Sequence, residues 1–128
     1  MGTGNREPRE TVWSAGILSS ISKKANGTIL SVHGHEMQAP GWPDSYISHK
    51  YWKGWIEFKG SKTRLTDLQK MILSKLGANG DRVYVVRYPN LIQHYEGVLL
   101  TRFTIGTTND GISMLKAICA YEKEGTRK

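Results

Sequence analysis

The 128-residue sequence has one cysteine, Cys119, and no apolar run long enough to cross a membrane. A single cysteine excludes an intramolecular disulfide and favours a reducing compartment. The first residues carry no apolar segment of the kind found in secretory signals. Every apolar run falls far short of the roughly 18 residues that a transmembrane helix needs. We therefore expect a cytoplasmic protein with no membrane partner.

Several catalytic signatures are also missing. The chain contains no recognisable Ser-His-Asp set, Gly-rich phosphate loop or haem motif, and no internal repeat or low-complexity block. His33-Gly34-His35-Glu36 suggests zinc, but no second ligand pair follows at zinc spacing. We interpret this segment as a polar loop.

Acidic residues are few relative to basic ones. The chain has 18 Lys and Arg against 11 Asp and Glu, which gives a formal charge of +7 at pH 7. This balance suits a polyanionic partner, because each cation placed near a phosphate releases counterions. Between Gly41 and Lys75 there are seven basic and three acidic residues. In this stretch we predict six nucleic-acid contacts: Lys50, Trp52, Lys53, Lys62, Arg64 and Lys70.

The aromatic residues near the centre of the chain have two interpretations. Trp52 lies in a basic connection between two predicted strands, where its ring could stack on a splayed base or wedge a branched DNA. Alternatively, these rings belong to the core or to a subunit interface, and for Trp42 and Trp55 this second interpretation is favoured.

Apolar spacing predicts one domain over residues 1–128, with loose ends at about 1–6 and 123–128. The predicted order is α-β-β-β-α-β-β-α, an α/β fold with a central mixed sheet flanked by helices. We expect helices over residues 8–24 and 66–76 and a last helix capped by Asn109 or Asp110. We expect strands over residues 28–33, 46–48, 55–58, 82–88 and 93–103, the last irregular at Gly97. The predicted buried side of the second helix is Leu65, Leu68, Ile72 and Leu76, and that of the last helix is Ile112, Leu115, Ile118 and Cys119.

The stretch Gly41–Gly60 places two carboxylates around a predicted strand pair. Residues 55–58 look like a strand, so Glu57 and Lys59 share one face, opposite to Ile56 and Phe58. The connection over residues 49–53 has the length of a hairpin loop, so antiparallel pairing would bring Asp44 to Glu57. Two carboxylates this close repel unless a hard divalent cation lies between them.

The pattern of Asp44 followed by Glu57-x-Lys59 resembles the PD-(D/E)XK nuclease superfamily. Gly41-x-Pro43-Asp44, Lys59-Gly60 and the run from Arg64 to Gln69 (RLTDLQ) are most similar to its VRR-NUC branch, over about residues 7–90. The resemblance implies a restriction-endonuclease-like core and a DNA endonuclease that uses Mg²⁺, with Mn²⁺ able to substitute. It also implies action on branched or junction DNA, as by phage enzymes.

The resemblance assigns Asp44 and Glu57 as metal ligands, the Phe58 carbonyl as a third and Glu10 as a further carboxylate. The simpler alternative for Glu10 is an acid in a first helical turn that favours the helix dipole.

Two further residues complete the implied catalytic set. Lys59 would position or deprotonate the attacking water or stabilise the developing charge, and Gln69 would orient water or phosphate. Each has a structural alternative: Lys59 could form a salt bridge with Glu57 or Asp44, and Gln69 could close a capping box with Thr66.

Two other functions stay open, a homing or restriction-type endonuclease on the same core and a basic nucleic-acid-binding protein without catalysis. We also expect a homodimer, because four Trp and six Tyr exceed what one site needs and aromatic residues are enriched at interfaces. Two sites are needed to cut both strands, and a two-fold dimer supplies them. The expected interface lies on the last helix, around Ile112–Tyr121, and on the 93–103 strand.

Overall fold

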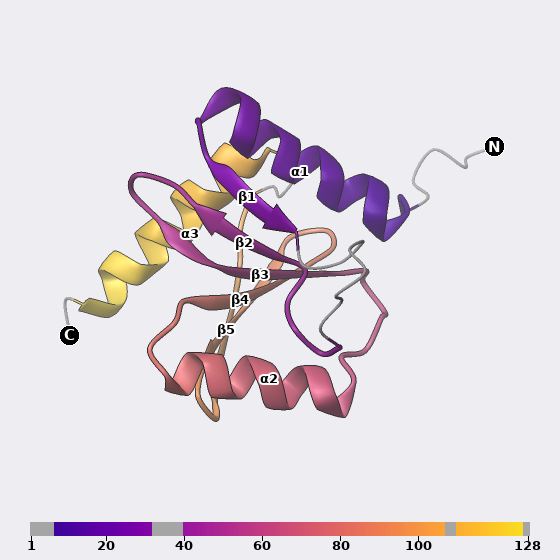
Figure 1. Ribbon diagram of the computed structural model, residues 1–128, viewed down its shortest axis with the longest axis vertical. Helices are drawn as coiled ribbons and strands as arrows, with labels where there is room; N and C mark the ends of the chain where they lie inside the picture. Colours follow the sequence, from indigo (N-terminus) through magenta and orange to yellow (C-terminus); the bar gives the residue numbers. More distant parts are fainter. Residues whose placement is uncertain (1–6, 32–39, 107–109, 127–128) are drawn as a thin grey trace.

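The computed structural model describes residues 7–31, 40–106 and 110–126, which form a mixed α/β fold (Figure 1). The described elements are α1 (Glu10–Lys24), β1 (Thr28–Ser31), β2 (Ser45–Ser48), β3 (Lys53–Lys59), α2 (Asp67–Ala78), β4 (Val83–Arg87), β5 (Leu91–Glu96), β6 (Leu99–Thr104) and α3 (Gly111–Thr126). The predicted order is confirmed except for one additional strand.

The sheet has six strands in the order β1-β2-β3-β4-β5-β6. Every neighbouring pair is antiparallel except β3 and β4, which run parallel. A parallel pair needs a crossover connection, which α2 supplies. Figure 1 shows α2 on one face of the sheet and α1 with α3 on the other.

The central strands are buried on both faces, and the alternation of their side chains determines which face each polar side chain occupies. Ile56, Phe58 and Tyr84 belong to the core cluster that includes α1 and α3 residues. Val83 and Val85 belong to the cluster that includes α2 residues, and Trp55 packs against it. Because side chains alternate along a strand, Glu57 and Lys59 share the α2 face with Trp55.

The prediction of one strand over residues 93–103 is wrong, because the chain folds there into the β5–β6 hairpin. Gly97 and Val98 form the connection, and Gly97 has φ 69°, in the left-handed region that glycine adopts without a steric penalty. Glycine at the first position of a two-residue loop is typical of tight hairpins. The irregularity expected at Gly97 is therefore a complete reversal of the chain.

The helices also differ in detail from the predicted ones. Leu68 is 42% exposed, whereas Leu73 is 1% exposed, so the buried stripe of α2 is rotated away from the predicted one. Asp110 caps α3 as predicted, by accepting from the Ile112 amide at 3.1 Å. The helix continues to Thr126, into the range expected to be a loose end. The segments 1–6 and 33–36 and the alternative cap Asn109 lie outside the described residues.

Among the described residues, no helix is both long and apolar enough to cross a membrane.

Candidate active site

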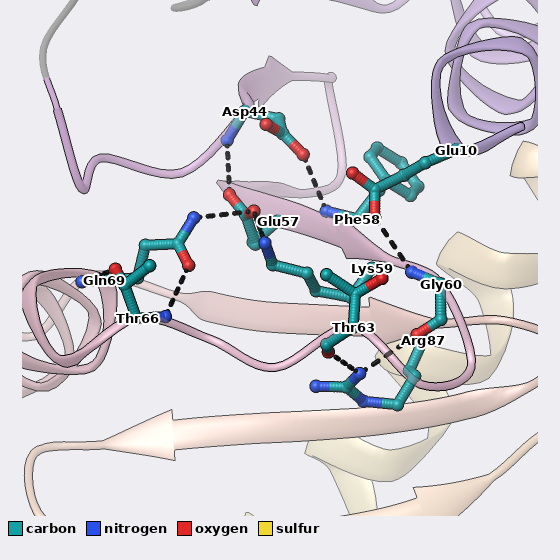
Figure 2. Close-up of polar contacts among 10 residues, drawn as sticks. All are labelled: Glu10, Asp44, Glu57, Phe58, Lys59, Gly60, Thr63, Thr66, Gln69 and Arg87. Atoms are coloured by element: carbon teal, nitrogen blue, oxygen red, sulfur yellow. Dashed lines mark hydrogen bonds and ion pairs between the residues drawn. The ribbon is translucent and has the colours of Figure 1, made fainter.

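Asp44 and Glu57 lie side by side at the ends of two neighbouring strands. Ser45 on β2 is the register partner of Ile56 on β3, so the preceding residue, Asp44, falls opposite Glu57. Two hydrogen bonds fix this arrangement (Figure 2): the Asp44 amide donates to Glu57 Oε1 at 3.0 Å, and the Phe58 amide donates to Asp44 Oδ2 at 2.9 Å. The predicted juxtaposition of the two carboxylates is confirmed.

The segment before Asp44 is held against α2 by a glycine. Gly41 has φ 83°, and a Cβ atom there would lie 2.6 Å from the Leu68 side chain. Any other residue would therefore be strained and would push the segment away from the helix. Pro43 is buried immediately before Asp44. The Gly41-x-Pro43-Asp44 pattern thus has a local structural reason, which is to bring the Asp44 carboxylate to the end of β3.

Glu57 is buried in an unfavourable electrostatic environment. It is 2% exposed, and burial together with the negative charge of Asp44 raises its pKa from 4.5 to about 8. Lys59 opposes this rise, with its Nζ 3.6 Å from Glu57 Oε2, while Glu10 adds to it. A cation bound here would relieve both the repulsion between carboxylates and the desolvation of Glu57.

The capping box predicted for Gln69 is confirmed, and another atom of the same side chain contacts Glu57; the role of Gln69 in orienting water or phosphate stays a prediction. The side-chain Oε1 of Gln69 accepts from the backbone amide of Thr66 at 2.9 Å. The backbone amide of Gln69 donates to Thr66 Oγ1 at 3.1 Å, which completes the capping box. Gln69 Nε2 donates to Glu57 Oε2 at 3.3 Å. Figure 2 shows the side chain reaching from the start of α2 to the carboxylate on β3.

Glu10 also reaches the site. Its Oε1 accepts from the Gly60 amide at 2.9 Å, just past the end of β3. Glu10 is the weakest of the causes that raise the pKa of Glu57, and its assignment as a metal ligand stays a prediction.

The loop that follows β3 is held from two sides. Glu7 accepts from the Ser61 hydroxyl and amide, and these bonds lower its pKa. Arg87 donates to the Gly60 carbonyl at 3.0 Å and to the Thr63 carbonyl (Figure 2). The loop carries two of the predicted DNA contacts, Lys62 and Arg64, and both are exposed.

Three of the predicted nucleic-acid contacts lie away from the site. Lys50, Trp52 and Lys53 are in or next to the β2–β3 turn, four residue pairs along the ladder from Asp44 and Glu57. At about 3.3 Å per residue this is a separation of roughly 13 Å. Trp52 is 3% exposed and donates to Glu122 Oε2 at 3.2 Å, so the prediction that its ring stacks on a base is wrong.

Sequence reasoning missed three residues that share the α2 face with Glu57 on the strands beyond β3: Arg87, Gln93 and Arg102. They line a groove over β4, β5 and β6 together with the predicted Arg64 and Lys70. Strand parity could have indicated Arg87, which has the same parity as Val83 and Val85 on the α2 face. Arg102 would be assigned to the face opposite to Gln93, because the reversal at Gly97 was not predicted.

The donor set fits a hard cation that keeps several waters. No cluster of three or more His, Cys, Asp or Glu in the described part of the chain is arranged to hold a metal ion. Asp44 and Glu57 supply two carboxylates. The Phe58 amide faces Asp44, and the amide and carbonyl of one strand residue point to the same side. Two carboxylates and one carbonyl suit Mg²⁺ or Mn²⁺, which bind through oxygen and retain water ligands.

Comparison of the chain with models of protein families, with curated proteins and with solved structures found no match. The chemistry of the site therefore carries the functional proposal.

Proposed function

We propose that this chain is a DNA endonuclease of the PD-(D/E)XK type, similar to the VRR-NUC branch, which hydrolyses phosphodiester bonds with Mg²⁺ or Mn²⁺ held at Asp44 and Glu57. The observation that carries the proposal is the locked carboxylate pair, in which a buried Glu57 has an amide-fixed Asp44 beside it. A purely structural role does not account for this pair, because a buried carboxylate beside a second negative charge destabilises the fold.

The restriction-endonuclease-like core belongs to the same proposal. An antiparallel β1-β2-β3 unit followed by α2 and a parallel β4 supports it, because this is the element order predicted for the stretch that carries the resemblance. Glu10 on α1, Asp44 just before β2, Glu57 on β3 and Gln69 on α2 then lie near one another (Figure 2).

Phosphodiester hydrolysis needs an activated water and neutralisation of charge on the phosphate, which a bound divalent cation supplies. Lys59 is 8% exposed and shares the α2 face with Glu57. Its ammonium is placed to orient the attacking water or to stabilise the negative charge that develops on phosphate. Gln69 Nε2 orients the Glu57 carboxylate.

The test is cleavage of a panel of linear, flapped and junction DNAs with Mg²⁺, Mn²⁺, Ca²⁺ or EDTA. We expect cleavage with Mg²⁺ and Mn²⁺ only, because Ca²⁺ has longer and looser coordination. Asp44→Asn and Glu57→Gln should abolish cleavage and retain DNA binding, whereas Glu124→Gln, which removes an exposed carboxylate on α3, should cleave normally. Equal rates in Mg²⁺ and EDTA, or an active Asp44→Asn, would refute the proposal.

A second candidate is a nucleic-acid-binding protein without catalysis. The basic groove favours it, because a groove lined by Arg and Lys can bind a polyanion without using the carboxylate pair. Tight DNA binding without turnover under every metal condition would select this alternative.

A further inference from the structure

A groove of about 530 Å³ lies on the α2 face of the sheet, over β4, β5 and β6. Its polar lining comes from four elements and one loop, and includes Arg64, Lys70, Arg87, Gln93, Tyr95 and Arg102. The volume is in the range of pockets that hold a small ligand, such as one nucleotide.

Strand register connects the groove to the proposed active site. Lys59 on β3 is the partner of Arg87 on β4. Glu57 is the partner of Val85, and Val85 is the partner of Gln93. Directly paired residues lie on the same face of a sheet, and adjacent strands are about 4.8 Å apart. The groove therefore begins one strand beyond Lys59 and shares its face.

Four cations meet in this groove without a carboxylate to balance them. Among the described residues, neither Arg64, Lys70 nor Arg102 is in a salt bridge, and Arg87 donates only to two carbonyl oxygens. Arg102 and Arg87 are both close enough to Tyr95 to act against the rise that burial causes in its pKa. A convergence of like charges is unfavourable unless an anion binds among them.

Gln93 gives the second, independent sign of a ligand. It is 7% exposed, and its Oε1 is buried without a hydrogen-bond partner. Its Nε2 makes no hydrogen bond among the described residues and is not fully buried, so this amino group is the amide atom of Gln93 that a ligand in the groove can reach. An unpartnered buried amide oxygen lowers stability, so packing alone does not explain a glutamine here.

The polar groups of the groove are therefore predominantly donors: guanidinium, ammonium and amide groups that converge from α2, three strands and the loop after β3. A ligand that matches this lining has several acceptor oxygens and negative charge. A phosphate group has both, and arginine binds it through paired N–H donors.

We infer that this groove binds a phosphate group of the nucleic-acid strand that is attacked at Asp44 and Glu57, one or more nucleotides away from the scissile bond. The identity of the strand rests on the proposed function, whereas the preference for a phosphate group follows from the groove itself. Arg87, Arg102 and Gln93 then act as strand-positioning residues.

The test measures binding of a short fluorescein-labelled single-stranded DNA by anisotropy, in EDTA, as a function of salt. Arg102→Gln should weaken binding about tenfold and reduce the salt slope by about one, as expected for a lost phosphate contact. Lys23→Gln is the matched control, since it removes an equal charge from the exposed end of α1, outside the groove. An equal loss in the control would mean non-local attraction and would overturn the inference.

Gln93→Leu separates groove chemistry from charge. It removes the buried amide without changing net charge, so the melting temperature should hold or rise while DNA binding weakens. A variant that melts at or above the wild-type temperature and binds as wild type would overturn the role of Gln93. A misfolded Gln93→Leu leaves the decision to Arg102→Gln, whose side chain is exposed.

Further arms identify the source of the phosphate. A 5′-phosphorylated strand, the same strand without that phosphate, and inorganic phosphate as competitor are compared. We expect both strands to bind and inorganic phosphate to compete weakly. Competition by inorganic phosphate at strand-like concentrations would mean a free-anion site and would overturn the inference.

Failure of the inference is distinguishable from failure of the proposed function. If Arg102→Gln binds and cleaves as wild type does and Asp44→Asn is inactive, the inference about the groove is refuted and the proposed nuclease activity stands. Binding lost in Arg102→Gln, with no cleavage by wild type under any metal condition, overturns the nuclease and leaves the groove.

Discussion

Glu57→Gln should stabilise the metal-free protein at alkaline pH while it abolishes the proposed cleavage. Glu57 is 2% exposed, and its pKa is raised from 4.5 to about 8 by burial and by Asp44. The folded state therefore holds a proton that the unfolded state releases between these two pH values. The free energy of unfolding falls as pH rises through this window and levels off above about 8.

The size of the effect can be bounded. One pKa unit corresponds to about 1.4 kcal/mol, so the rise from 4.5 to about 8 sets a ceiling near 5 kcal/mol. The introduced glutamine would keep an oxygen for the Asp44 amide, but it would present an amino group to Gln69 Nε2, which now donates to Glu57 at 3.3 Å. The variant would also lose the ion pair with Lys59. These losses cost about 1–3 kcal/mol, so we expect a net gain of roughly 2 kcal/mol at about pH 9 and a net loss of about 1–3 kcal/mol at about pH 4.5, where wild-type Glu57 is protonated.

The assay is urea unfolding in EDTA at several pH values for wild type, Glu57→Gln and the exposed control Glu124→Gln. Mg²⁺ should recover part of the stability that wild type loses at high pH, because it binds the deprotonated carboxylate. It should have little effect on Glu57→Gln. Wild-type stability that rises between about pH 5 and 8, or a Glu57→Gln variant that is less stable at about pH 9, would refute the reasoning.

Three further predictions concern other contacts. Gln69→Glu keeps an acceptor for the Thr66 amide but places a second carboxylate against Glu57, so helix content should stay the same while melting temperature and cleavage fall. Unaltered cleavage would mean that Gln69 acts only in the capping box. Glu122→Gln weakens the contact with the Tyr84 hydroxyl, 2.6 Å away, and should lower stability by about 1–2 kcal/mol with DNA binding unchanged, measured by urea unfolding and anisotropy. The proposed homodimer should appear in sedimentation equilibrium, and Leu99→Lys, on the exposed edge strand β6, should shift it toward monomer; a monomer mass across the concentration range for the wild type would exclude the dimer.

The carboxylate pair could be predicted from the sequence because it depends on local rules. Strand alternation fixes the face of Glu57, and a short connection fixes which residue of β2 lies opposite it. The capping box at Thr66 and Gln69 is also local, since three residues separate its partners. Each of these contacts follows from spacings that are visible in the chain.

Long-range packing could not be predicted in this way. The residues around Trp52 have the composition of a surface loop. Its ring nevertheless lies in the core, and its indole N–H donates a hydrogen bond to Glu122, 70 residues further along the chain. Glu122 immediately precedes the C-terminal end that was expected to be loose, and its partners Trp52, Tyr84 and Arg82 become neighbours only in the folded sheet. No local pattern encodes these contacts.

The unpredicted reversal at Gly97 changed the number of strands, and it also changed which residues share a face of the sheet. A single long strand gives Gln93 and Arg102 opposite parity and hence opposite faces, whereas the hairpin makes them direct partners on one face. The groove therefore cannot be predicted from a sequence interpretation that misses the turn. Its lining by both Gln93 and Arg102 depends on the register of β5 with β6.

Two buried polar groups on the α2 face remain unexplained by folding stability alone. Glu57 is buried beside a second carboxylate, and Gln93 is buried with an unpartnered oxygen. Val85 lies between them in the same row across the sheet and is fully buried in the core cluster that includes α2 residues. Apolar side chains at positions 57 and 93 would extend that packing and remove both costs. A cation beside Glu57 would offset the first cost, and a phosphate in the groove would accept a hydrogen bond from the Gln93 Nε2 amino group. In the proposed function, one strand that crosses β3, β4 and β5 along this row carries both the phosphate attacked at the cation and the phosphate bound in the groove.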